Sequence, residues 1–468
     1  MEVTVVSDRT QSVAFVSWPS APLTASLVRS ALLSLAIVDN ASIHSNLVRL
    51  SNNKFIQWSS YDEIDHGLTY SDHLNVLSSS YVIRKALIRK HFLSRCIHAY
   101  LTKHPDTVLR TAVPKTWEID ISFADELDEL WADELWDLSG ILDRQTASPE
   151  TDGDRWWILK PGMADRGMGI RVFNSKETLH RILVDFDDSC SDGDGDGNGD
   201  GDGDMAVDET VKDTSVAISQ LRHFVIQEYL SKPLLLDPHE VPPGGALSPP
   251  TDQLQGHKFH LRAYCVAAGD VTLYLYTRVL ALFSLKPYTH PAPATDGGID
   301  LAPHLTNSSL QTHRGEEGVR LLDELVGCHV MSGDAGDGPR SNLLTQSHLE
   351  NIQDQMAHTL SETFKAAIQS PIHFQPVANA FELYGVDFLV EHTSSSPLRF
   401  QVKLLEVNAE PAIELTGPRL TWILEDLFKA MARVCVDPFV RDSPVEAWPV
   451  GDTKHYLKKC LQTKVRGF

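Results

Sequence analysis

Apolar residues recur at strand and helix spacing along this chain and predict a mixed α and β protein. Residues 156–173 fit a strand ending at Lys160, a glycine-bearing turn and a second strand. Short apolar strands are predicted at 224–226, 381–390 and 400–409, with a polar turn at 392–396. Helical spacing predicts helices over 84–93, 122–138 and 348–368. The pattern as a whole favours an α+β fold.

Proline and glycine runs divide the chain into three expected parts. These are an α/β N-terminal domain over 1–80, a main domain over 81–435 and a helical C-terminal extension over 436–468. The main domain would begin with a helical lead-in over 81–150. Loops are expected at 237–256, 289–303 and 332–341.

One acidic segment stands apart from the rest of the chain. Residues 187–213 hold eleven acidic side chains and one lysine, and 192–204 almost strictly alternate Gly with Asp. Such a tract has nothing to bury, so we expect a disordered insertion. The alternative is an EF-hand calcium loop from Asn198 to Glu209, although an asparagine stands at its first position and no amphipathic helix precedes it.

Composition excludes several classes of protein. The 468 residues are 42% hydrophobic with a net charge of -22, which argues against a protein that binds nucleic acid directly through phosphate neutralisation. The longest apolar N-terminal run is too short to span a bilayer and no signal peptide precedes it, so we expect no membrane contact and a cytoplasmic location. Six scattered cysteines, with no CxxC pair and no histidines close to them, suggest neither a disulfide framework nor a zinc site.

Two basic features suggest phosphate binding. Lys160 precedes a turn that contains Arg166 and Gly167, where glycine lets backbone N–H groups approach a polyphosphate; glycine turns between strands are common, so this signal is weak. Lys258, His260 and Arg262 alternate along one strand and so share one face. Such a row repels itself unless an anion lies there, and a solvated outer face is the alternative.

Three oxygen-bearing residues on the two C-terminal strands suggest a metal site. Glu406 and Asn408 share a face, and Asp387 joins them if the strands form a hairpin. Two carboxylates and an amide are hard oxygen ligands suited to Mg²⁺. A purely structural ion pair between Asp387 and Arg262 is the alternative.

The order of these motifs resembles the tubulin-tyrosine ligase-like family, over about residues 84–433. The shared motifs are Lys160-Pro161 before a glycine turn, VIQEYL at 225–230, KFxLR at 258–262, HLTN at 304–307, and GxDF at 385–388 followed by LEVN at 405–408. The chain more nearly resembles the ligase half of fungal P-body-associated members. In those proteins a SurE-like nucleotidase domain precedes the ligase, and we see none in the first 80 residues.

The resemblance implies an ATP-grasp fold, in which two lobes of mixed and antiparallel sheet clasp ATP, and an ATP- and Mg²⁺-dependent ligase that joins a free amino acid to a protein carboxylate. Lys160 and Lys258 would hold phosphates, as would Lys90 more weakly. Arg262 would stabilise the transferred phosphate, and His304 and Asn307 would lie near the reacting groups. The hinge that meets adenine would be Gln227, Glu228, Tyr229 and Leu230, and the Mg²⁺ ligands would be Asp387, Glu406 and Asn408.

Two departures from the family pattern leave a second function open. His260 stands where the family usually has an aspartate near the ribose or substrate amine, and the arginine pair expected within 274–282 is missing, with Arg278 one position out of register. The alternative is therefore an ATP-binding interaction module with weakened catalysis, associated with P-bodies or mRNA. Tubulin is the protein acceptor by family default, but its acidic tails suit a chain of charge -22 poorly.

Overall fold

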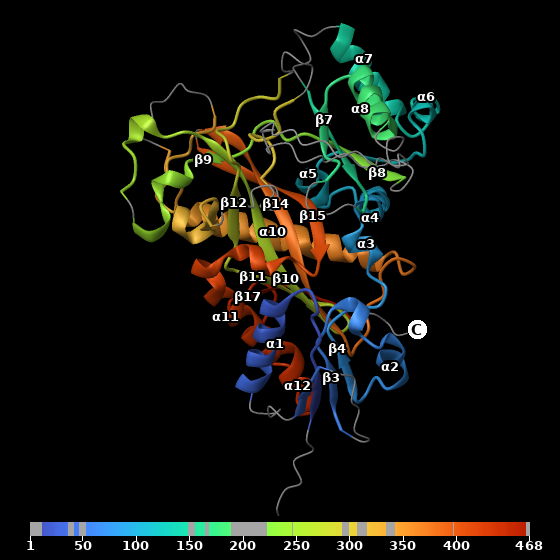
Figure 1. Ribbon diagram of the computed structural model, residues 1–468, viewed down its shortest axis with the longest axis vertical. Helices are drawn as coiled ribbons and strands as arrows, with labels where there is room; N and C mark the ends of the chain where they lie inside the picture. Colours follow the sequence, from blue (N-terminus) through green and yellow to red (C-terminus); the bar gives the residue numbers. More distant parts are fainter. Residues whose placement is uncertain are drawn as a thin grey trace, which may run out of the picture.

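The computed structural model describes residues 12–35, 42–45, 53–147, 155–163, 168–188, 222–245, 247–292, 299–306, 316–333, 342–395 and 397–464. Three sheets organise these residues (Figure 1). The acidic insertion with its EF-hand-like spacing lies outside the described residues, as do Arg166, Gly167 and Asn307. Within the described part, no helix is long and apolar enough to span a bilayer.

The largest sheet forms the centre of the molecule. Its main path runs β13-β12-β10-β11-β17-β16, and β14 pairs with β10 and β15 while β9 pairs with the start of β10. All its pairings are antiparallel. The strands are β9 (Leu235–Leu236), β10 (His257–Ala268), β11 (Thr272–Tyr276), β12 (Leu280–Phe283), β13 (Val319–Leu321), β14 (Phe381–Ser395), β15 (Leu398–Ala409), β16 (Thr453–Lys454) and β17 (Leu457–Gln462).

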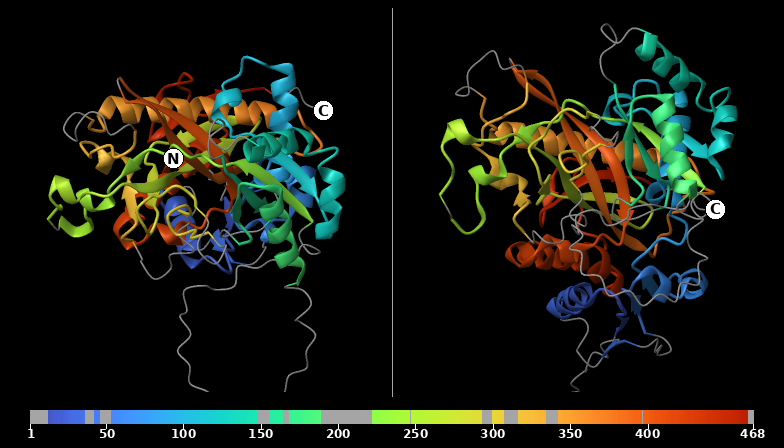
Figure 2. Two further views of the ribbon diagram at one scale, coloured as in Figure 1. Left: turned by 90° about the horizontal axis from the view of Figure 1, so that it is seen from above. Right: turned by 45° about the horizontal axis from the view of Figure 1, so that its top comes forward.

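Helix α10 (Gln346–Ile368) lies along one face of this sheet (Figure 2). Leu349, Ile352, Met356 and Leu360 recur at three- and four-residue spacing and are fully buried, so they form the apolar stripe of this helix. They belong to one buried cluster with alternate residues of β10, including Phe259 and Leu261, and α10 itself contacts β15 and β17 of the same sheet. The intervening residues of β10, Lys258 and His260 among them, therefore face the opposite side of the sheet.

A four-stranded antiparallel sheet, ordered β5-β8-β6-β7, forms a second lobe. It contains β5 (Thr116–Asp120), β6 (Trp157–Pro161), β7 (Arg171–Phe173) and β8 (His223–Glu228). Helices α6 (Leu127–Leu130), α7 (Trp136–Ala147) and α8 (Lys176–Asp188) accompany it (Figure 1). Its core combines sheet residues such as Phe173 and Phe224 with Leu138 and Leu183 from the helices.

The segment predicted as a helical lead-in is not wholly helical. It contains α3 (Lys85–Ile88), α4 (Lys90–Lys103) and α5 (Leu109–Ala112), but residues 116–120 form edge strand β5. The helix predicted over 122–138 is broken between α6 and α7. Leu127, Leu135 and Leu138 are all buried in one cluster with residues of the sheet although no single helix carries them.

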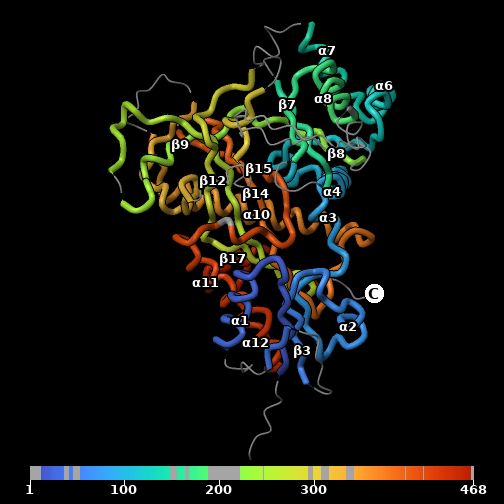
Figure 3. The backbone as a smooth tube through the Cα atoms, in the orientation of Figure 1, coloured from blue at the N-terminus to red at the C-terminus, as the bar shows by residue number. Residues whose placement is uncertain are grey.

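The N-terminal residues form an α/β unit. Its sheet, ordered β2-β1-β3-β4, is parallel throughout. The elements are β1 (Val13–Phe15), α1 (Pro22–Ser34), β2 (Ile43–His44), β3 (Phe55–Gln57), α2 (His66–Ser71) and β4 (Val76–Ser78). Figure 3 shows α1 beside α11 (Thr421–Met431) and α12 (Asp437–Val440), and Val28 and Leu427 belong to one buried cluster.

The C-terminal segment differs from the helical extension predicted over 436–468. Beyond α12 its regular structure consists of β16 and β17, and β17 pairs with β11 of the central sheet. Leu457, Cys460 and Leu461 are buried there. Pairing with β11 satisfies the backbone N–H and C=O groups of both strands. Local sequence preference does not reveal this pairing, so tertiary context decides the conformation of the segment.

Candidate functional site

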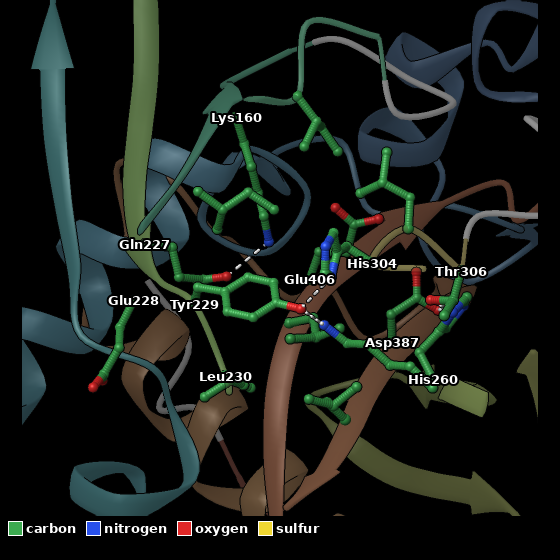
Figure 4. A pocket seen from close by; sticks show the side chains of 16 residues that line it. Lys160, Gln227, Glu228, Tyr229, Leu230, His260, His304, Thr306, Asp387 and Glu406 are labelled. Atoms are coloured by element: carbon green, nitrogen blue, oxygen red, sulfur yellow. Dashed lines mark hydrogen bonds and ion pairs between the residues drawn. The ribbon is translucent and has the colours of Figure 1, made fainter. Parts of the chain in front are cut away.

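A cleft lies between the central sheet and the sheet of the second lobe, where β6 and β8 face β10, β14 and β15. Its empty volume is about 820 Å³, including space that is open to solvent. This volume is within the range of small-molecule and cofactor sites. Of the residues predicted for phosphate, hinge and metal contacts, Lys160, Lys258, His260, residues 227–230, Asp387 and Glu406 come together on its walls (Figure 4). Lys90, Arg262 and Asn408 are not among the described residues that line it. Its lining comprises Ile158, Lys160, Ile170, Gln227, Glu228, Tyr229, Leu230, Lys258, His260, His304, Leu305, Thr306, Asp387, Leu389, Leu405 and Glu406.

Lys160 enters the cleft from β6. Its Nζ donates a hydrogen bond to Oε1 of Gln227 on neighbouring β8 at 2.7 Å. The Lys160 side chain is buried, and burial lowers its pKa to about 8 because an ammonium is poorly solvated there. An anion in the cleft would restore the charged form, so this lysine is suited to a phosphate.

Lys258 enters from the other wall, on β10. Its Nζ donates to the hydroxyl of Tyr229 at 3.1 Å, and that hydroxyl lies 2.9 Å from Nδ1 of His304. Burial, with the nearby charge of Lys160, lowers the pKa of Lys258 to about 7. Burial also lowers the pKa of His304 to about 4, so at neutral pH its imidazole is neutral. The tyrosine thus links the Lys258 amine to a neutral ring.

The hinge segment 227–230 combines apolar and polar contacts. Tyr229 and Leu230 are buried, while Glu228 is exposed and turns away from Tyr229 in Figure 4. Ile158 and Leu389 add apolar lining from β6 and β14. The backbone N–H groups of Glu228 and Tyr229 already donate to the carbonyl oxygens of Lys115 and Trp156, so this wall offers mainly apolar surface to the cleft.

His260 is held in one orientation. Its Nδ1 lies 2.6 Å from Oγ1 of Thr306, and its buried Nε2 has no hydrogen-bond partner among the described residues. Nε2 also lies 3.6 Å from Oδ1 of Asp387. Burial lowers the pKa of His260, which favours the neutral ring. An unpartnered buried nitrogen costs stability unless a ligand meets it.

The predicted metal ligands converge at the β14–β15 hairpin. Asp387 and Glu406 are direct partners in its register, and Asn408 Nδ2 lies 3.2 Å from Asp387 Oδ2 and 3.3 Å from Glu406 Oε1. Burial alone would raise the pKa of Glu406, but Lys90, Lys160 and Arg262 outweigh it and hold that pKa well below its usual range. Two carboxylates with an adjacent amide are a donor set that fits Mg²⁺.

Cationic side chains surround this hairpin corner. Arg262 donates to both oxygens of Asp387, one bond being 2.8 Å from its Nη2 to Oδ2, and Lys90 Nζ lies 3.2 Å from Glu406 Oε2. The ion pair between Asp387 and Arg262, which was the purely structural alternative, is thus present. The three predicted metal ligands nevertheless also converge. Asn408 turns its Nδ2 toward the carboxylates, so coordination of a cation would need the amide to turn over and present Oδ1.

Some site residues were not evident from the sequence. Thr306, which fixes His260, and the apolar residues Ile170 and Leu389 line the cleft. Thr306 lies within the HLTN motif, so that motif could have indicated it. Arg278 lies elsewhere: it stacks on Trp422 and Tyr456 and pairs with Asp426 at 3.4 Å, and it is not among the described residues that line the cleft.

Comparisons with known proteins agree with this geometry. The chain is 34% identical over 411 residues to "Probable tubulin--tyrosine ligase PBY1" of Saccharomyces cerevisiae, covering 86% of this chain and 49% of that protein. It is 35% identical over 408 residues to "Probable tubulin--tyrosine ligase C12B10.04" of Schizosaccharomyces pombe, covering 87% of this chain and 88% of that protein. The chain therefore spans about half the length of the first relative.

A solved structure supports the fold. The C-terminal domain of Pby1 from K. lactis, described as an ATP-grasp enzyme interacting with the mRNA decapping enzyme Dcp2, matches with a TM-score of 0.63 and 27% identity. The match covers 97% of this chain and all of that domain. The predicted α+β fold of the ATP-grasp type is confirmed. Because the family model of the tubulin-tyrosine ligases also matches residues 73–444, this chain belongs to the tubulin-tyrosine ligase family.

Proposed function

We propose that this chain is an ATP- and Mg²⁺-dependent ligase that joins an amino acid to a protein carboxylate. The observation that carries the proposal is the meeting of Lys160 and Lys258, from different sheets, with the Asp387–Glu406 pair in one cleft. The two lysines are suited to phosphate oxygens, and the carboxylates to a hard cation. This combination of groups supports ATP-dependent activation of a carboxylate as the proposed chemistry.

The proposed reaction has two steps. An oxygen of the acceptor carboxylate attacks the γ-phosphorus of ATP, and the bond to ADP breaks to leave an acyl phosphate. The amine of an amino acid then attacks the acyl carbon, an amide bond forms, and inorganic phosphate and a proton leave. In both steps the chain would act mainly by positioning the reactants and neutralising their charge.

Named side chains would divide this work. Lys160 and Lys258 become fully charged when phosphate oxygens approach, and Arg262 extends the positive row along β10 toward the transferred group. Asp387, Glu406 and Asn408 would hold Mg²⁺, which supplies charge neutralisation for phosphate oxygens when bound. His304, neutral and bonded to Tyr229, would lie beside the phosphates. Lys90 balances the charge of Glu406 from α4.

The test of ligation searches for the modified protein product inside cells. Cells expressing this chain and cells expressing Glu406→Gln are searched by mass spectrometry for peptides heavier by one amino-acid residue. The proposal expects such peptides only with the unsubstituted chain, and the modified peptide then serves as the acceptor in an ADP-release assay. Identical peptide sets, with no ADP release on any acceptor tested, would contradict ligation.

The second candidate is an interaction module that binds ATP without ligating. Two observations favour it: the family's aspartate is replaced by His260, and Arg278 is engaged with aromatic rings away from the cleft. A relative of known structure interacts with Dcp2, so the proposed partners are a decapping enzyme for the module and a protein acceptor, tubulin by family default, for the ligase. Nucleotide binding without ADP release would favour the module.

A further inference from the structure

A group of three metal-binding side chains lies on the opposite face of β10 from the cleft. Asp237, His239 and His257 each offer one ligand atom, and these atoms all lie within 4.8 Å of one another. Asp237 follows β9 and His257 begins β10, where it pairs with Leu236. The group therefore joins the two ends of the loop at 237–256, and only the pairing of β9 with β10 brings its members together.

Hydrogen bonds already orient two of the three side chains. Oδ1 of Asp237 lies 2.8 Å from Nδ1 of His239, and the rings of His239 and His257 are 5.9 Å apart. Nδ1 of His257 lies 3.1 Å from the carbonyl oxygen of Ser284. A carbonyl can only accept, so Nδ1 of His257 carries the proton and Nε2 holds the lone pair. A histidine that donates its other nitrogen to a carbonyl is the usual arrangement of a metal ligand.

The turn that carries these side chains is held from both sides. Asp237 accepts from the backbone N–H of His239 at 2.8 Å and from that of Gln255 at 2.7 Å. Arg320, itself buried, donates to the carbonyl oxygens of Pro238 at 2.8 Å and Val241 at 2.6 Å. The ligand positions thus depend on a fixed backbone rather than on an open loop.

We propose that Asp237, His239 and His257 form a binding site for a divalent cation of the zinc type. One carboxylate and two imidazoles are ligands that Zn²⁺ accepts readily, and their nitrogens disfavour Mg²⁺ and Ca²⁺. Asp237 and His257 are buried, while the side chain of His239 is 57% exposed. Water can therefore complete a tetrahedral set from the side of His239.

Occupancy would fix the start of β10. His257 immediately precedes Lys258, whose side chain points into the cleft from the other face of the strand. A cation bridging Asp237 to His257 would clamp β9 to β10 at that point. None of its three ligands lines the cleft in the described structure, so the proposed cation site does not require that the chain is a ligase.

The test measures zinc binding by the full chain after treatment with a chelator and dialysis. Zn²⁺ is titrated calorimetrically into the unsubstituted chain and into His239→Ala. The substitution removes an exposed side chain, leaves no cavity and should preserve folding, which a melting curve checks. We expect the loss of one equivalent of bound Zn²⁺, or at least a tenfold weaker affinity, and the same loss in Asp237→Asn.

Matched variants separate this site from other histidines and from the cleft. His180→Ala removes an exposed histidine on α8 and should retain the full equivalent, as should Glu406→Gln. Co²⁺ bound to the unsubstituted chain should show visible absorption bands of nitrogen ligation that His239→Ala lacks. Equal zinc stoichiometry and affinity in the unsubstituted chain and His239→Ala would overturn the proposal.

Discussion

Asp387 and Glu406 stand directly opposite each other across the β14–β15 hairpin, and both carboxylates point into the cleft (Figure 4). Like charges opposite each other on one sheet face are destabilising unless cations compensate them. Arg262 and Lys90 supply that compensation from β10 and α4. The chain therefore carries a preformed charge arrangement at the place where a cation and phosphates would meet.

Removing one of these charges should weaken nucleotide binding. Glu406→Gln keeps the volume of the side chain but lowers the negative charge of the proposed metal site, so we expect Mg²⁺-ATP affinity to fall about tenfold or more, which corresponds to roughly 1.4 kcal/mol. Calorimetry with magnesium present measures it. Glu425→Gln, an exposed substitution on α11, is the control and should bind like the unsubstituted chain; equal affinity in both variants would refute the assignment.

Nucleotide binding should take up protons. Burial lowers the pKa of Lys160 to about 8 and that of Lys258 to about 7, so both are partly neutral at pH 8 without ligand. Phosphates favour the charged forms and raise both pKa values, so affinity should be highest below pH 7 and fall as pH rises above it, by up to about tenfold per unit for each lysine.

Calorimetry of this effect at pH 8, in buffers of different ionisation enthalpy, should show uptake of about one proton or more. Lys160→Gln should reduce the uptake. An affinity that rises between pH 7 and pH 9 would contradict the placement of the lysines against phosphate.

A buried ion pair should anchor the segment before α3 to the central sheet. Glu382 on β14 accepts from Arg84, from the backbone N–H of Tyr81 at 3.2 Å and from the hydroxyl of Tyr384 at 2.7 Å. Glu382→Ala leaves these donors buried without an acceptor, so we expect a loss of about 3–5 kcal/mol in the free energy of unfolding. Chemical denaturation measures it.

The control for this loss is an exposed pair. Lys54 and Asp442 lie 2.7 Å apart, with Asp442 75% exposed, so Asp442→Asn should cost about 1 kcal/mol or less. Similar losses for the two substitutions would show that the Glu382 network contributes no more than a surface contact.

We expect that His260 contributes to the activity of the site rather than weakening it. His260→Asp would break the contact with Thr306 and place a further carboxylate beside Asp387, offsetting positive charge needed for phosphate. We expect ADP release on a confirmed acceptor to fall about tenfold, which corresponds to roughly 1.4 kcal/mol of barrier. Thr306→Val isolates the loss of the contact and should have a smaller effect. Faster ADP release in His260→Asp would instead identify a chain whose catalysis the histidine has weakened.

Local sequence pattern predicted the parts of the fold in which one face is buried. Alternation along β10 placed Lys258 and His260 on one face and Phe259 and Leu261 on the other, and the structure agrees. The i, i+2 rule likewise placed Glu406 and Asn408 on one face, and the expected hairpin brought Asp387 to them. These predictions succeeded because the backbone of a strand makes successive side chains alternate between its two faces.

Tertiary pairing accounts for what sequence pattern missed. β5 is an edge strand that depends on β8, and β17 lies between β11 and β16 and depends on β11; β8 and β11 lie far away in sequence from the strands they hold. The contact between His260 and Thr306 spans 46 residues, and the group around Asp237 depends on the pairing of β9 with β10. No local periodicity reports such contacts.

The most direct test of the account is a crystal structure of the chain with Mg²⁺ and a non-hydrolysable ATP analogue. The account predicts adenine against residues 227–230, phosphates within hydrogen-bonding distance of both Lys160 and Lys258, and a metal ion coordinated by Asp387 and Glu406. A nucleotide bound outside this cleft, or bound in it with both lysines still held by Gln227 and Tyr229 and no metal ion at the hairpin, would contradict it.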